Sequence, residues 1–451
     1  MTKRFAVVGS GLIGLYMAHA LRKRGHEVTL YSERTAHQWL NESKPTGVAG
    51  RFRGTLALEN ELGLSHWDDI GPMVGGVHLT LSLNAKNRIL TACAPVTGKA
   101  MAVDMRLQIS RWMSDLEERG GRVVVQQVDA ASLDKIAQEN DLTFVGVGRG
   151  PLCSLFARDE ARSLRHAPPR KLAVAIVKGP KAIPNVPFTP VKFNISPEEG
   201  ETFWNPVLHK SGESMWAPLI EAIPGRSWDR FSDCKSGHEV VARAKELIRE
   251  RMPWEYEWFK DAELADEHGW LVGEILPSVR GPVATLPSGR SVLALGDTAV
   301  SMDPCAGQGA NNGARMVRSY AASIDARGDQ PFDAEWMKSA FETFWADSGK
   351  TTYFFSDLLT QPLSKAGQDL ITAAYGSDGK GTTPEDVIAR AIGENFVDPN
   401  SLTPAFVDKS ASHAFIEKTV GGSPGWHLFK KTLRIGRQQV RQKLGMAPQH
   451  P

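Results

Sequence analysis

The residues from Gly296 to Asn312 hold the densest set of groups that could bind a charged ligand. An apolar run at 291–295 precedes Gly296, and a segment typical of a helix begins at Gly313. A strand, a turn and a helix in this order present backbone N–H groups, because the first N–H groups of a helix have no partner within it and the helix dipole is positive there. The same pattern also occurs at ordinary joints between a strand and a helix.

A second glycine-rich joint lies near the N-terminus and has the spacing GxGxxG. It is the sequence Gly9-Ser10-Gly11-Leu12-Ile13-Gly14, between an expected strand at 4–9 and an expected helix at 12–24. In such a unit the first glycine makes the turn, the second admits a pyrophosphate, and the third lets the helix pack on the strand. The pyrophosphate would lie at the N-terminus of the helix. The pattern therefore predicts dinucleotide binding.

Several polar residues downstream are candidates for contact with the same cofactor. Ser32 is the first position after a second expected strand at 27–31, and Glu33 stands 19 positions after Gly14. Either could bind the adenosine ribose, as the acid at the end of the second strand does in this motif. Lys44 lies in the loop that follows, and Arg106 begins an amphipathic helix, from which it could reach a phosphate or a ribose. An ordinary surface role is the alternative for both basic residues.

A third segment, 141–150, is an expected strand that ends in glycines, including Gly148. Binding segments so far apart in the sequence suit a long, extended cofactor, and FAD is the natural candidate. Asp297 would then accept hydrogen bonds from the ribityl hydroxyls, and the turn after it would direct N–H groups to the flavin N1/O2 edge. The residues of this second segment expected to contact FAD are Gly296, Asp297, Pro304, Gly307, Gln308, Gly309, Ala310 and Asn311.

The composition limits the remaining possibilities. The 451 residues carry 53 basic and 51 acidic side chains, a balance that argues against nucleic acid or an anionic membrane as the partner. Four dispersed cysteines without CxxC fit a reducing compartment and offer no metal site. No apolar run reaches the roughly 20 residues of a membrane span, and too few precede Gly9 for a signal peptide. We expect a cytoplasmic protein.

The order of the elements predicts an α/β fold. The FAD-binding Rossmann-type domain is expected at 1–165 together with 281–330, interrupted by a hairpin near 75–97. A substrate-binding domain with a mixed or antiparallel β-sheet is expected at 166–280, and a helical C-terminal region at 331–451. The sequence lacks HExxH and Walker motifs, and no residue stands out as catalytic. The flavin itself would then carry the reactive group, while the protein binds it and excludes water.

The chain resembles the flavin-dependent aromatic monooxygenases of the p-hydroxybenzoate hydroxylase superfamily, and among them the styrene and indole monooxygenases. The resemblance lies in the Gly9–Gly14 motif and in the sequences at 103–107, 116–121, 295–297, 303–311 and 394–396. The sequence Gly307-Gln308-Gly309-Ala310-Asn311 after Asp303-Pro304 is its most specific part. The flavin-dependent halogenases are more distant cousins, and their WxWxIP segment is absent.

This resemblance implies an FADH₂-dependent monooxygenase that adds one oxygen atom from O₂ to a small apolar aromatic or alkene, styrene- or indole-like, through a flavin C4a-hydroperoxide. A separate NADH-dependent flavin reductase would supply the FADH₂. The alternatives are a single-component NAD(P)H-dependent hydroxylase and a non-oxygenating FAD-binding reductase. A homodimer is left open, and so is the role of a basic C-terminal helix.

Two departures from the family bear on the substrate. The family's loop after the second strand contains an asparagine that faces substrate and flavin, and here Thr46 or Gly47 stands in its place. Cys305 follows Pro304 at a position where the resemblance to the family would favour an aliphatic residue. The expected residues of the substrate pocket are therefore Thr46, Gly47, Pro304 and Cys305.

Overall fold

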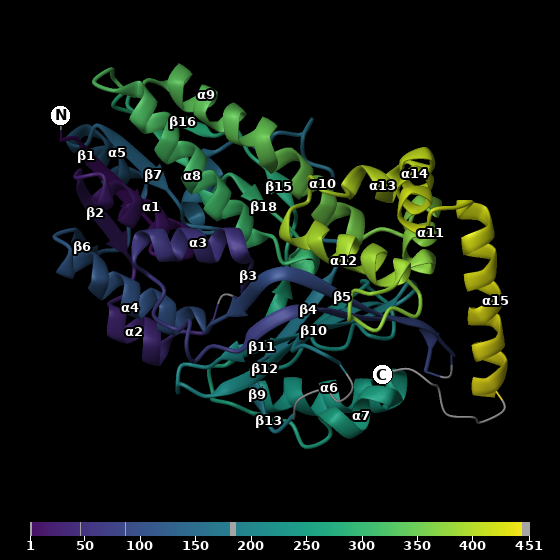
Figure 1. Cartoon of the computed structure of the whole chain (residues 1–451). Coiled ribbons are helices and arrows are strands. Elements are labelled where there is room, and N and C mark those ends of the chain that lie inside the picture. Colours follow the sequence, from purple (N-terminus) through teal and green to yellow (C-terminus); the bar gives the residue numbers. More distant parts are fainter. Residues whose placement is uncertain (1, 46, 86, 181–185, 444–451) are drawn as a thin grey trace. The chain divides into compact units, whose positions relative to one another are not determined.

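The computed structural model describes residues 2–45, 47–85, 87–180 and 186–443 (Figure 1). These residues form two compact units, each assembled from three stretches of the chain. The first unit comprises 1–69, 103–168 and 275–357, and the second comprises 70–102, 169–274 and 358–451. These ranges differ from the expected domains in two respects. The hairpin and the C-terminal helices belong to the same unit as the sheet at 169–274, and residues 331–357 belong to the first unit.

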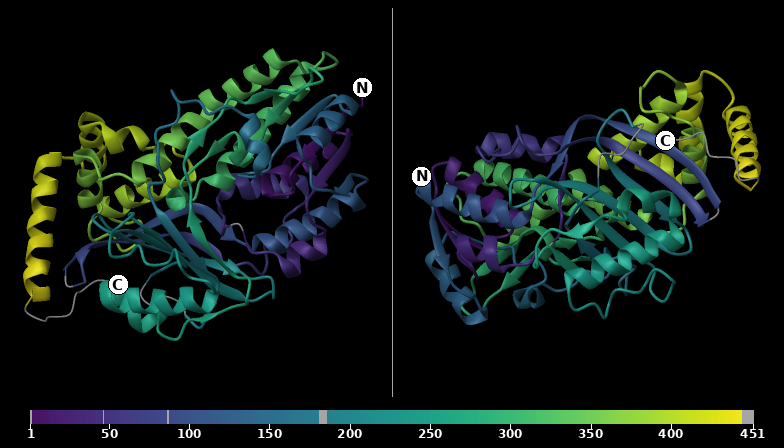
Figure 2. Two further views of the ribbon diagram at one scale, coloured as in Figure 1. Left: turned by 180° about the vertical axis from the view of Figure 1, so that it is seen from behind. Right: turned by 90° about the horizontal axis from the view of Figure 1, so that it is seen from below.

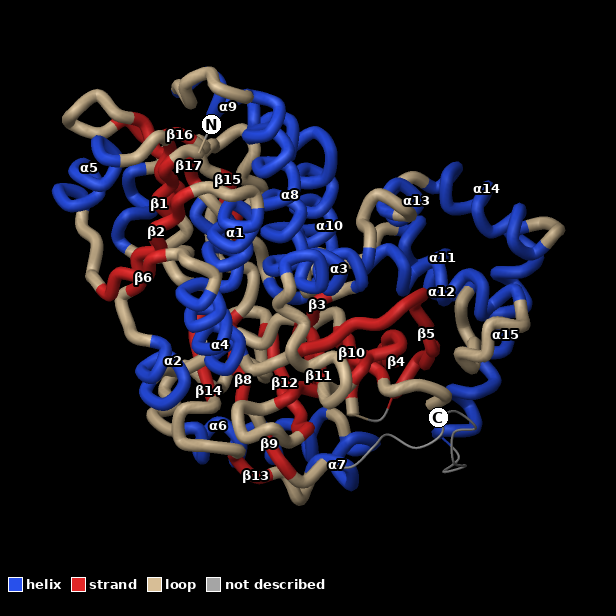
Figure 3. Tube along the Cα trace, turned by 60° about the vertical axis from the view of Figure 1, so that its left-hand side comes forward, coloured by secondary structure: helices blue, strands red, loops and turns tan. Residues whose placement is uncertain are grey.

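The first unit is built on a six-stranded sheet with the order β16-β17-β7-β1-β2-β6. All neighbouring strands are parallel except β16 and β17, and the helices of a βαβ arrangement connect them. The strands in sheet order are β16 (Val283–Thr285), β17 (Ser291–Ala294), β7 (Leu142–Val145), β1 (Arg4–Val8), β2 (Glu27–Ser32) and β6 (Arg122–Val125). Figure 3 shows β1, β2 and β6 side by side. The predicted Rossmann-type sheet is confirmed.

Most helices of this unit begin where the sequence offers a capping group or a glycine turn, whereas α3 begins after Phe52 without a side-chain cap. Asp104 caps its helix by accepting a hydrogen bond from the N–H of Arg106 at 3.0 Å, and Thr35 forms a capping box with Gln38. The helices are α1 (Leu12–Lys23), α2 (Ala36–Glu42), α3 (Arg53–Leu62), α4 (Met105–Glu118), α5 (Ala130–Glu139), α8 (Gly309–Arg327) and α9 (Ala334–Phe344). Short pieces are β3 (Gly50–Arg51), β15 (Ser278–Val279), β18 (Val300–Ser301), η1 (Pro151–Leu155), η2 (Gly296–Thr298), η3 (Pro304–Ala306) and η4 (Trp345–Gly349).

The second unit contains most of a ten-stranded sheet, in which the predicted hairpin pairs with the later strands. Its strands are β4 (Met73–Asn84), β5 (Asn87–Ala102), β8 (Lys171–Ala175), β9 (Val177–Lys178), β10 (Pro190–Ser196), β11 (Gly200–Leu208), β12 (Ser214–Ala222), β13 (Glu263–Leu264) and β14 (Trp270–Glu274). Most neighbours are antiparallel, whereas β10 and β4 are parallel, so the sheet is mixed as expected.

Helices cover the sheet of the second unit. The helices α6 (Gly237–Arg251) and α7 (Pro253–Phe259) enclose an aromatic core in which Trp204 stacks on Trp258 at 4.9 Å between ring centroids. The helix α12 packs on β5, and Figure 2 shows the C-terminal helices from two further sides. The C-terminal helices are α10 (Lys350–Leu359), which crosses the boundary between the units, α11 (Lys365–Ala373), α12 (Pro384–Val397), α13 (Thr403–Val407), α14 (Lys409–Val420) and α15 (Pro424–Lys443). The predicted helical C-terminal region is present.

Candidate functional site

The three segments singled out in the sequence meet at one edge of the first unit's sheet. The strands β1, β7 and β17 are parallel neighbours, so their carboxyl ends lie together. The approach is close: a Cβ atom on Gly9 would lie 2.3 Å from the carbonyl oxygen of Gly146, and one on Gly296 would lie 3.2 Å from the Ile13 side chain. Gly9 and Gly296 both have positive φ, which favours glycine at these two turns.

The first and third glycines of the N-terminal motif take the backbone roles predicted for them. A Cβ on Gly14 would lie 1.9 Å from the carbonyl oxygen of Gly9, so this glycine permits the close packing of α1 on β1. A Cβ on Gly11, in contrast, would meet no atom within 4 Å. Among the described residues, the backbone N–H groups of Leu12 and Ile13 have no hydrogen-bond acceptor. Open space and free donors at a helix N-terminus fit the pyrophosphate of a dinucleotide.

The end of β2 presents a buried hydroxyl and an exposed carboxylate. Ser32 is buried, and its Oγ lies 2.7 Å from Ser10 Oγ and 3.1 Å from the indole nitrogen of Trp39. The side chain of Glu33 is 56% exposed and pairs with its neighbour Arg34 at 3.3 Å. Arg34 also stacks over Trp39 at 5.0 Å. Ser32 therefore fixes the turn from inside, while Glu33 is the acid accessible to a ribose. Contact of either residue with FAD remains a prediction.

Asp297 combines an exposed side chain with a desolvated carboxyl group. Its carboxylate is accessible to solvent, although protein atoms surround it closely enough to raise its pKa above the ordinary value. Desolvation is the larger cause, and the positive charges of Arg149 and Arg280 oppose it. A desolvated carboxylate is favoured in its charged form when hydroxyl groups donate to it. This property fits the predicted role of Asp297 toward the ribityl chain.

The turn before α8 bonds within itself through a side chain and leaves two of its backbone N–H groups free. The buried Gln308 bonds internally, donating from Nε2 to the carbonyl oxygen of Ala306 at 3.0 Å. The backbone N–H groups of Gly309 and Ala310 have no acceptor in the part of the chain that the structure describes. Pro304, like Gly309 and Ala310, is partly exposed. The helix begins at Gly309, four residues earlier than expected, so these free N–H groups are those of its first turn.

The side chain of Asn311 has a structural function that the sequence did not reveal. All four of its hydrogen bonds go to protein groups within the first unit, from Gly50 to Thr55 and at Gly307. The amide is therefore saturated, and any contact with FAD at this position must come from the backbone. Sequence reasoning had no signal for the distant partners.

The two basic candidates lie in different environments. Arg106 is buried, and its guanidinium forms a fork on Asp104 with nitrogen–oxygen distances of 2.7 to 3.2 Å. Because Asp104 balances its charge, Arg106 could serve to hold the start of α4 in place as readily as it could contact the cofactor. Lys44 is exposed, and desolvation lowers its pKa. Gly148 has open space above its Cα, and its carbonyl oxygen accepts from Cys153 Sγ at 2.7 Å.

The predicted substrate residues are only partly brought together. Thr46 lies outside the described residues, and Gly47 is half-buried in the loop before β3. Cys305 is buried, and its thiol donates to the carbonyl oxygen of Ser356 on α10 at 3.5 Å. Its side chain is thus part of the packing between η3 and α10. A role for Cys305 in substrate choice remains a prediction.

A buried polar cluster behind the loop was missed in the sequence. Arg51 donates from Nε to Glu59 Oε1 at 2.6 Å, and the hydroxyl of Tyr16 donates to the same oxygen. Arg51 also reaches Gln108 Oε1 at 3.4 Å. Arg51 and Glu59 are 0% exposed. Their separation of eight residues was the only feature of the sequence that could have suggested the pair. The cluster fixes β3 and the C-terminal half of α3 against α1 and α4.

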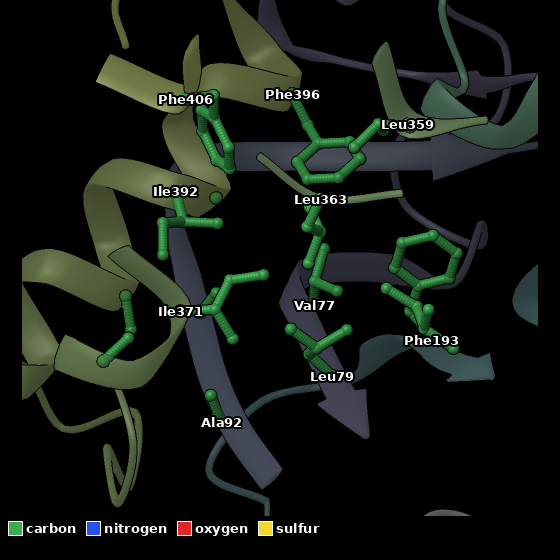
Figure 4. A pocket seen from close by; sticks show the side chains of 15 residues that line it. Val77, Leu79, Ala92, Phe193, Leu359, Leu363, Ile371, Ile392, Phe396 and Phe406 are labelled. Atoms are coloured by element: carbon green, nitrogen blue, oxygen red, sulfur yellow. The ribbon is translucent and has the colours of Figure 1, made fainter. Parts of the chain in front are cut away.

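The second unit contains an apolar cavity of about 40 Å³ (Figure 4). The strands β4, β5 and β10 provide its floor, including Val77 and Phe193, and the helical segments from α10 to α13 contribute Leu363, Ile392 and Phe406. Every lining side chain is apolar. Water in a cavity needs two to four polar partners, so this cavity favours an apolar guest.

Comparison with known proteins places the chain in a family. Residues 148–258 match the family described as styrene monooxygenase A putative substrate binding domain, and residues 7–37 match the NAD(P)-binding Rossmann-like domain. The chain is 30% identical over 341 residues to a styrene monooxygenase StyA from Pseudomonas sp, covering 72% of this chain and 76% of that protein. The chain belongs to the styrene monooxygenase family. A StyA from Pseudomonas fluorescens is 28% identical over 330 residues, with the same coverage.

Solved structures share the fold of this monooxygenase family member. They include the flavin-dependent brominase Bmp2, with a TM-score of 0.56 at 14% identity over 97% of this chain and 100% of that chain. The flavin-dependent halogenase CmlS aligns with a TM-score of 0.58 at 17% identity over 98% and 78%. For 2-methyl-3-hydroxypyridine-5-carboxylic acid oxygenase the TM-score is 0.53, at 15% identity over 86% and 96%. At these identities the likeness shows the fold alone.

Family membership and geometry agree on the cofactor. The protein is a flavin-dependent monooxygenase, and FAD is its cofactor. The open space over Gly11, the accessible carboxylate of Asp297 and the free N–H groups of Gly309 and Ala310 fit its pyrophosphate, its ribityl chain and its ring edge. Among the described residues, no helix is long and apolar enough to cross a bilayer.

Proposed function

We propose that this chain is the oxygenase component of a two-component system, which receives FADH₂ from a separate NADH-dependent reductase and epoxidises a small apolar alkene or arene of the styrene or indole type. The single observation that carries the proposal is that Gly11, Asp297 and the Gly309 turn offer groups that fit a flavin, in a chain of the styrene monooxygenase family. The sequence has no second GxGxxG for a nicotinamide nucleotide. This absence favours an external source of reducing equivalents.

In this proposal the protein positions groups and supplies no nucleophile. Bound reduced FAD supplies the chemistry by which O₂ is activated and one oxygen atom is transferred to the substrate. The N–H groups of Gly309 and Ala310 stabilise negative charge at the ring edge, because they belong to the positive end of α8. Asp297 holds the ribityl chain and thereby fixes the position of the ring.

The cavity of the second unit supports the apolar class of the substrate. A molecule without hydrogen-bonding groups recovers dispersion contacts there and leaves no polar atom unpaired. The absence of polar lining groups disfavours phenolic or carboxylated substrates, which would lose their hydrogen bonds to water on entry.

The decisive experiment supplies reducing equivalents in two ways. Purified protein with FAD, NADH, O₂ and styrene or indole should give no product, whereas addition of a flavin reductase, or of FADH₂ alone, should give epoxide or indole oxidation products. Oxygen-18 from labelled O₂ should appear in them. Efficient NADH oxidation by the chain alone would favour a single-component hydroxylase. FADH₂ oxidation without labelled product across the panel would favour a non-oxygenating flavoprotein.

The cavity is tested by a substitution at its partly exposed rim. Val77→Phe narrows the cavity and should raise the KM for styrene several-fold without changing flavin affinity. Leu83→Phe, an exposed position on the same strand and outside the cavity, is the matched control. Equal KM values in both variants would remove the cavity from the proposal and leave the two-component assignment intact.

A further inference from the structure

The final helix α15 has two faces, and one of them is anchored. Lys431 is only 6% exposed, and its Nζ donates to the carbonyl oxygen of Tyr375 at 2.8 Å and pairs with Glu385 at 2.6 Å. His427 Nε2 lies 3.2 Å from the carbonyl oxygen of Ala373, and Gln438 bonds to the Tyr375 hydroxyl. These contacts define the side of α15 that packs on the second unit, at the outside of which Figure 1 draws the helix in yellow.

The opposite face exposes large apolar side chains. Trp426, Phe429, Leu433 and Val440 are 60%, 52%, 48% and 57% exposed, and they account for four of the eleven exposed large apolar residues in the described chain. At about 100° per residue they fall within about 60° of one another, centred about 170° from Lys431. Trp426 and Phe429 stack with ring centroids 5.6 Å apart. We call these four residues the apolar stripe.

Basic residues border the apolar stripe along one edge. Lys430, Arg434, Arg437 and Arg441 are exposed, and Lys430 also lies over the Trp426 ring at 5.6 Å. The helix contains no acidic residue over its 20 positions. The whole chain is nearly neutral, so α15 is a local concentration of positive charge combined with exposed apolar surface.

We propose that α15 is a docking helix for an anionic lipid surface. A bilayer interface accepts large apolar side chains between its head groups and attracts Lys and Arg to the anionic phosphates, which is the combination presented by this helix. A second copy of the chain matches it poorly, because α15 has no acidic residue to face the partner's basic edge. Nucleic acid would use the basic edge but leave the apolar stripe in water. This inference revises the expectation of no membrane partner and does not depend on the oxygenase function.

The test is partition of the full-length protein onto vesicles, measured by co-sedimentation. Vesicles of phosphatidylcholine with phosphatidylglycerol should bind the protein at least several-fold better than phosphatidylcholine alone, and high salt should abolish the difference. The double variant Arg437→Gln/Arg441→Gln should lose roughly tenfold or more in binding to the anionic vesicles. The double variant Phe429→Ser/Leu433→Ser should lose binding to both kinds of vesicle. The control variant Val387→Ser replaces an exposed valine on α12 and should bind like the wild type.

Three results would overturn the proposal. The first is no preference of the wild-type protein for anionic vesicles. The second is partition that Phe429→Ser/Leu433→Ser leaves unchanged while the variant keeps its melting temperature. The third is a dimer, measured by light scattering, that dissociates in the apolar-stripe variant although no vesicle binding occurs, which would assign the face to a second copy.

Discussion

The side-chain amide of Asn311 at the start of α8 holds the backbone of Phe52. Its Oδ1 accepts from the N–H of Phe52 at 2.9 Å and from the hydroxyl of Thr55 at 2.8 Å. Its Nδ2 donates to the carbonyl oxygens of Gly50 and Gly307, both at 2.8 Å. One amide thereby joins two segments more than 250 residues apart, and one of them contains the turn expected at the flavin ring. The shape of that turn depends on a residue that need not touch the flavin with its side chain.

Removal of this amide should weaken both the fold and the flavin site. Asn311→Ala leaves buried donors and acceptors unpaired, so we expect a loss of about 3 kcal/mol in the free energy of unfolding and weaker FAD binding. Urea denaturation and fluorescence titration measure the two effects.

The neighbouring Asn312 is a matched control for this variant. Asn312 is as buried as Asn311, yet its Oδ1 has no hydrogen-bond partner among the described residues. Asn312→Ala should therefore cost clearly less stability than Asn311→Ala. Equal losses in the two variants would show that burial, rather than the four hydrogen bonds, determines the cost.

Gly11→Ala should lower the affinity for FAD while the protein remains folded. The added methyl group meets no protein atom, but it would occupy the space expected for the pyrophosphate. We expect at least a tenfold weaker binding, equivalent to about 1.4 kcal/mol, with an unchanged melting temperature. Gly14→Ala is the contrasting variant, because its methyl group would collide with the Gly9 carbonyl and lower the melting temperature. If Gly11→Ala bound FAD with wild-type affinity, the pyrophosphate would have to bind elsewhere.

Asp297 should make flavin affinity depend on pH. Its pKa in the free protein is raised, and donation from ribityl hydroxyls favours the ionised form, so binding lowers that pKa. Affinity should therefore fall as pH drops below the raised pKa and level off above it. The fall should begin at a higher pH than an ordinary aspartate would give. Asp297→Asn should bind more weakly at neutral pH and show a flatter profile. A wild-type profile that is as flat as that of Asp297→Asn would contradict this placement.

The meeting of the three segments expected to bind FAD was predictable, because its signals are local in sequence. GxGxxG, Gly296-Asp297 and the Gly307–Asn311 turn each fix a backbone geometry within a few residues, and parallel strand order then brings their ends together. The partners of Asn311 and the Arg51–Glu59 pair were not predictable, since they depend on how a loop folds back on α1 and α8. The expected domain ranges included a discontinuous first domain, but they did not place the hairpin and the C-terminal helices in the second unit. The reason is similar, because pairing of β4 with β10 depends on contacts across more than 100 residues.

All four cysteines should resist modification in the native protein. Each thiol is buried, and burial raises the pKa of Cys93 to about 12, with Asp378 and Asp386 as further causes. Desolvation also raises the pKa values of Cys153 and Cys234. Because the thiolate is the reactive form, a disulfide reagent at pH 8 should react with four thiols only after addition of denaturant. Fast reaction of one thiol under native conditions would identify a site that opens locally.

His19 should make the protein sensitive to mild acid. It is buried between α1 and α4, with Nε2 2.9 Å from the carbonyl oxygen of Trp112 and Nδ1 3.3 Å from a guanidinium nitrogen of Arg119. This geometry fits a neutral ring that donates from Nε2 and accepts at Nδ1. Desolvation is the main reason that its pKa falls to about 4, and Arg119 contributes.

The sign of the effect follows from proton binding in the two states. At pH values between about 4 and 6.5 the unfolded protein holds a proton on His19 that the folded protein lacks. The free energy of unfolding should therefore be unaffected above pH 6.5 and should decrease as pH falls toward 4, by about 3 kcal/mol in total. His19→Gln should remove most of this slope in urea denaturation between pH 7 and pH 4.5, whereas the exposed His37→Gln should leave it unchanged. An identical slope in the wild type and His19→Gln would mean that other groups, such as the paired carboxylates, account for the acid sensitivity.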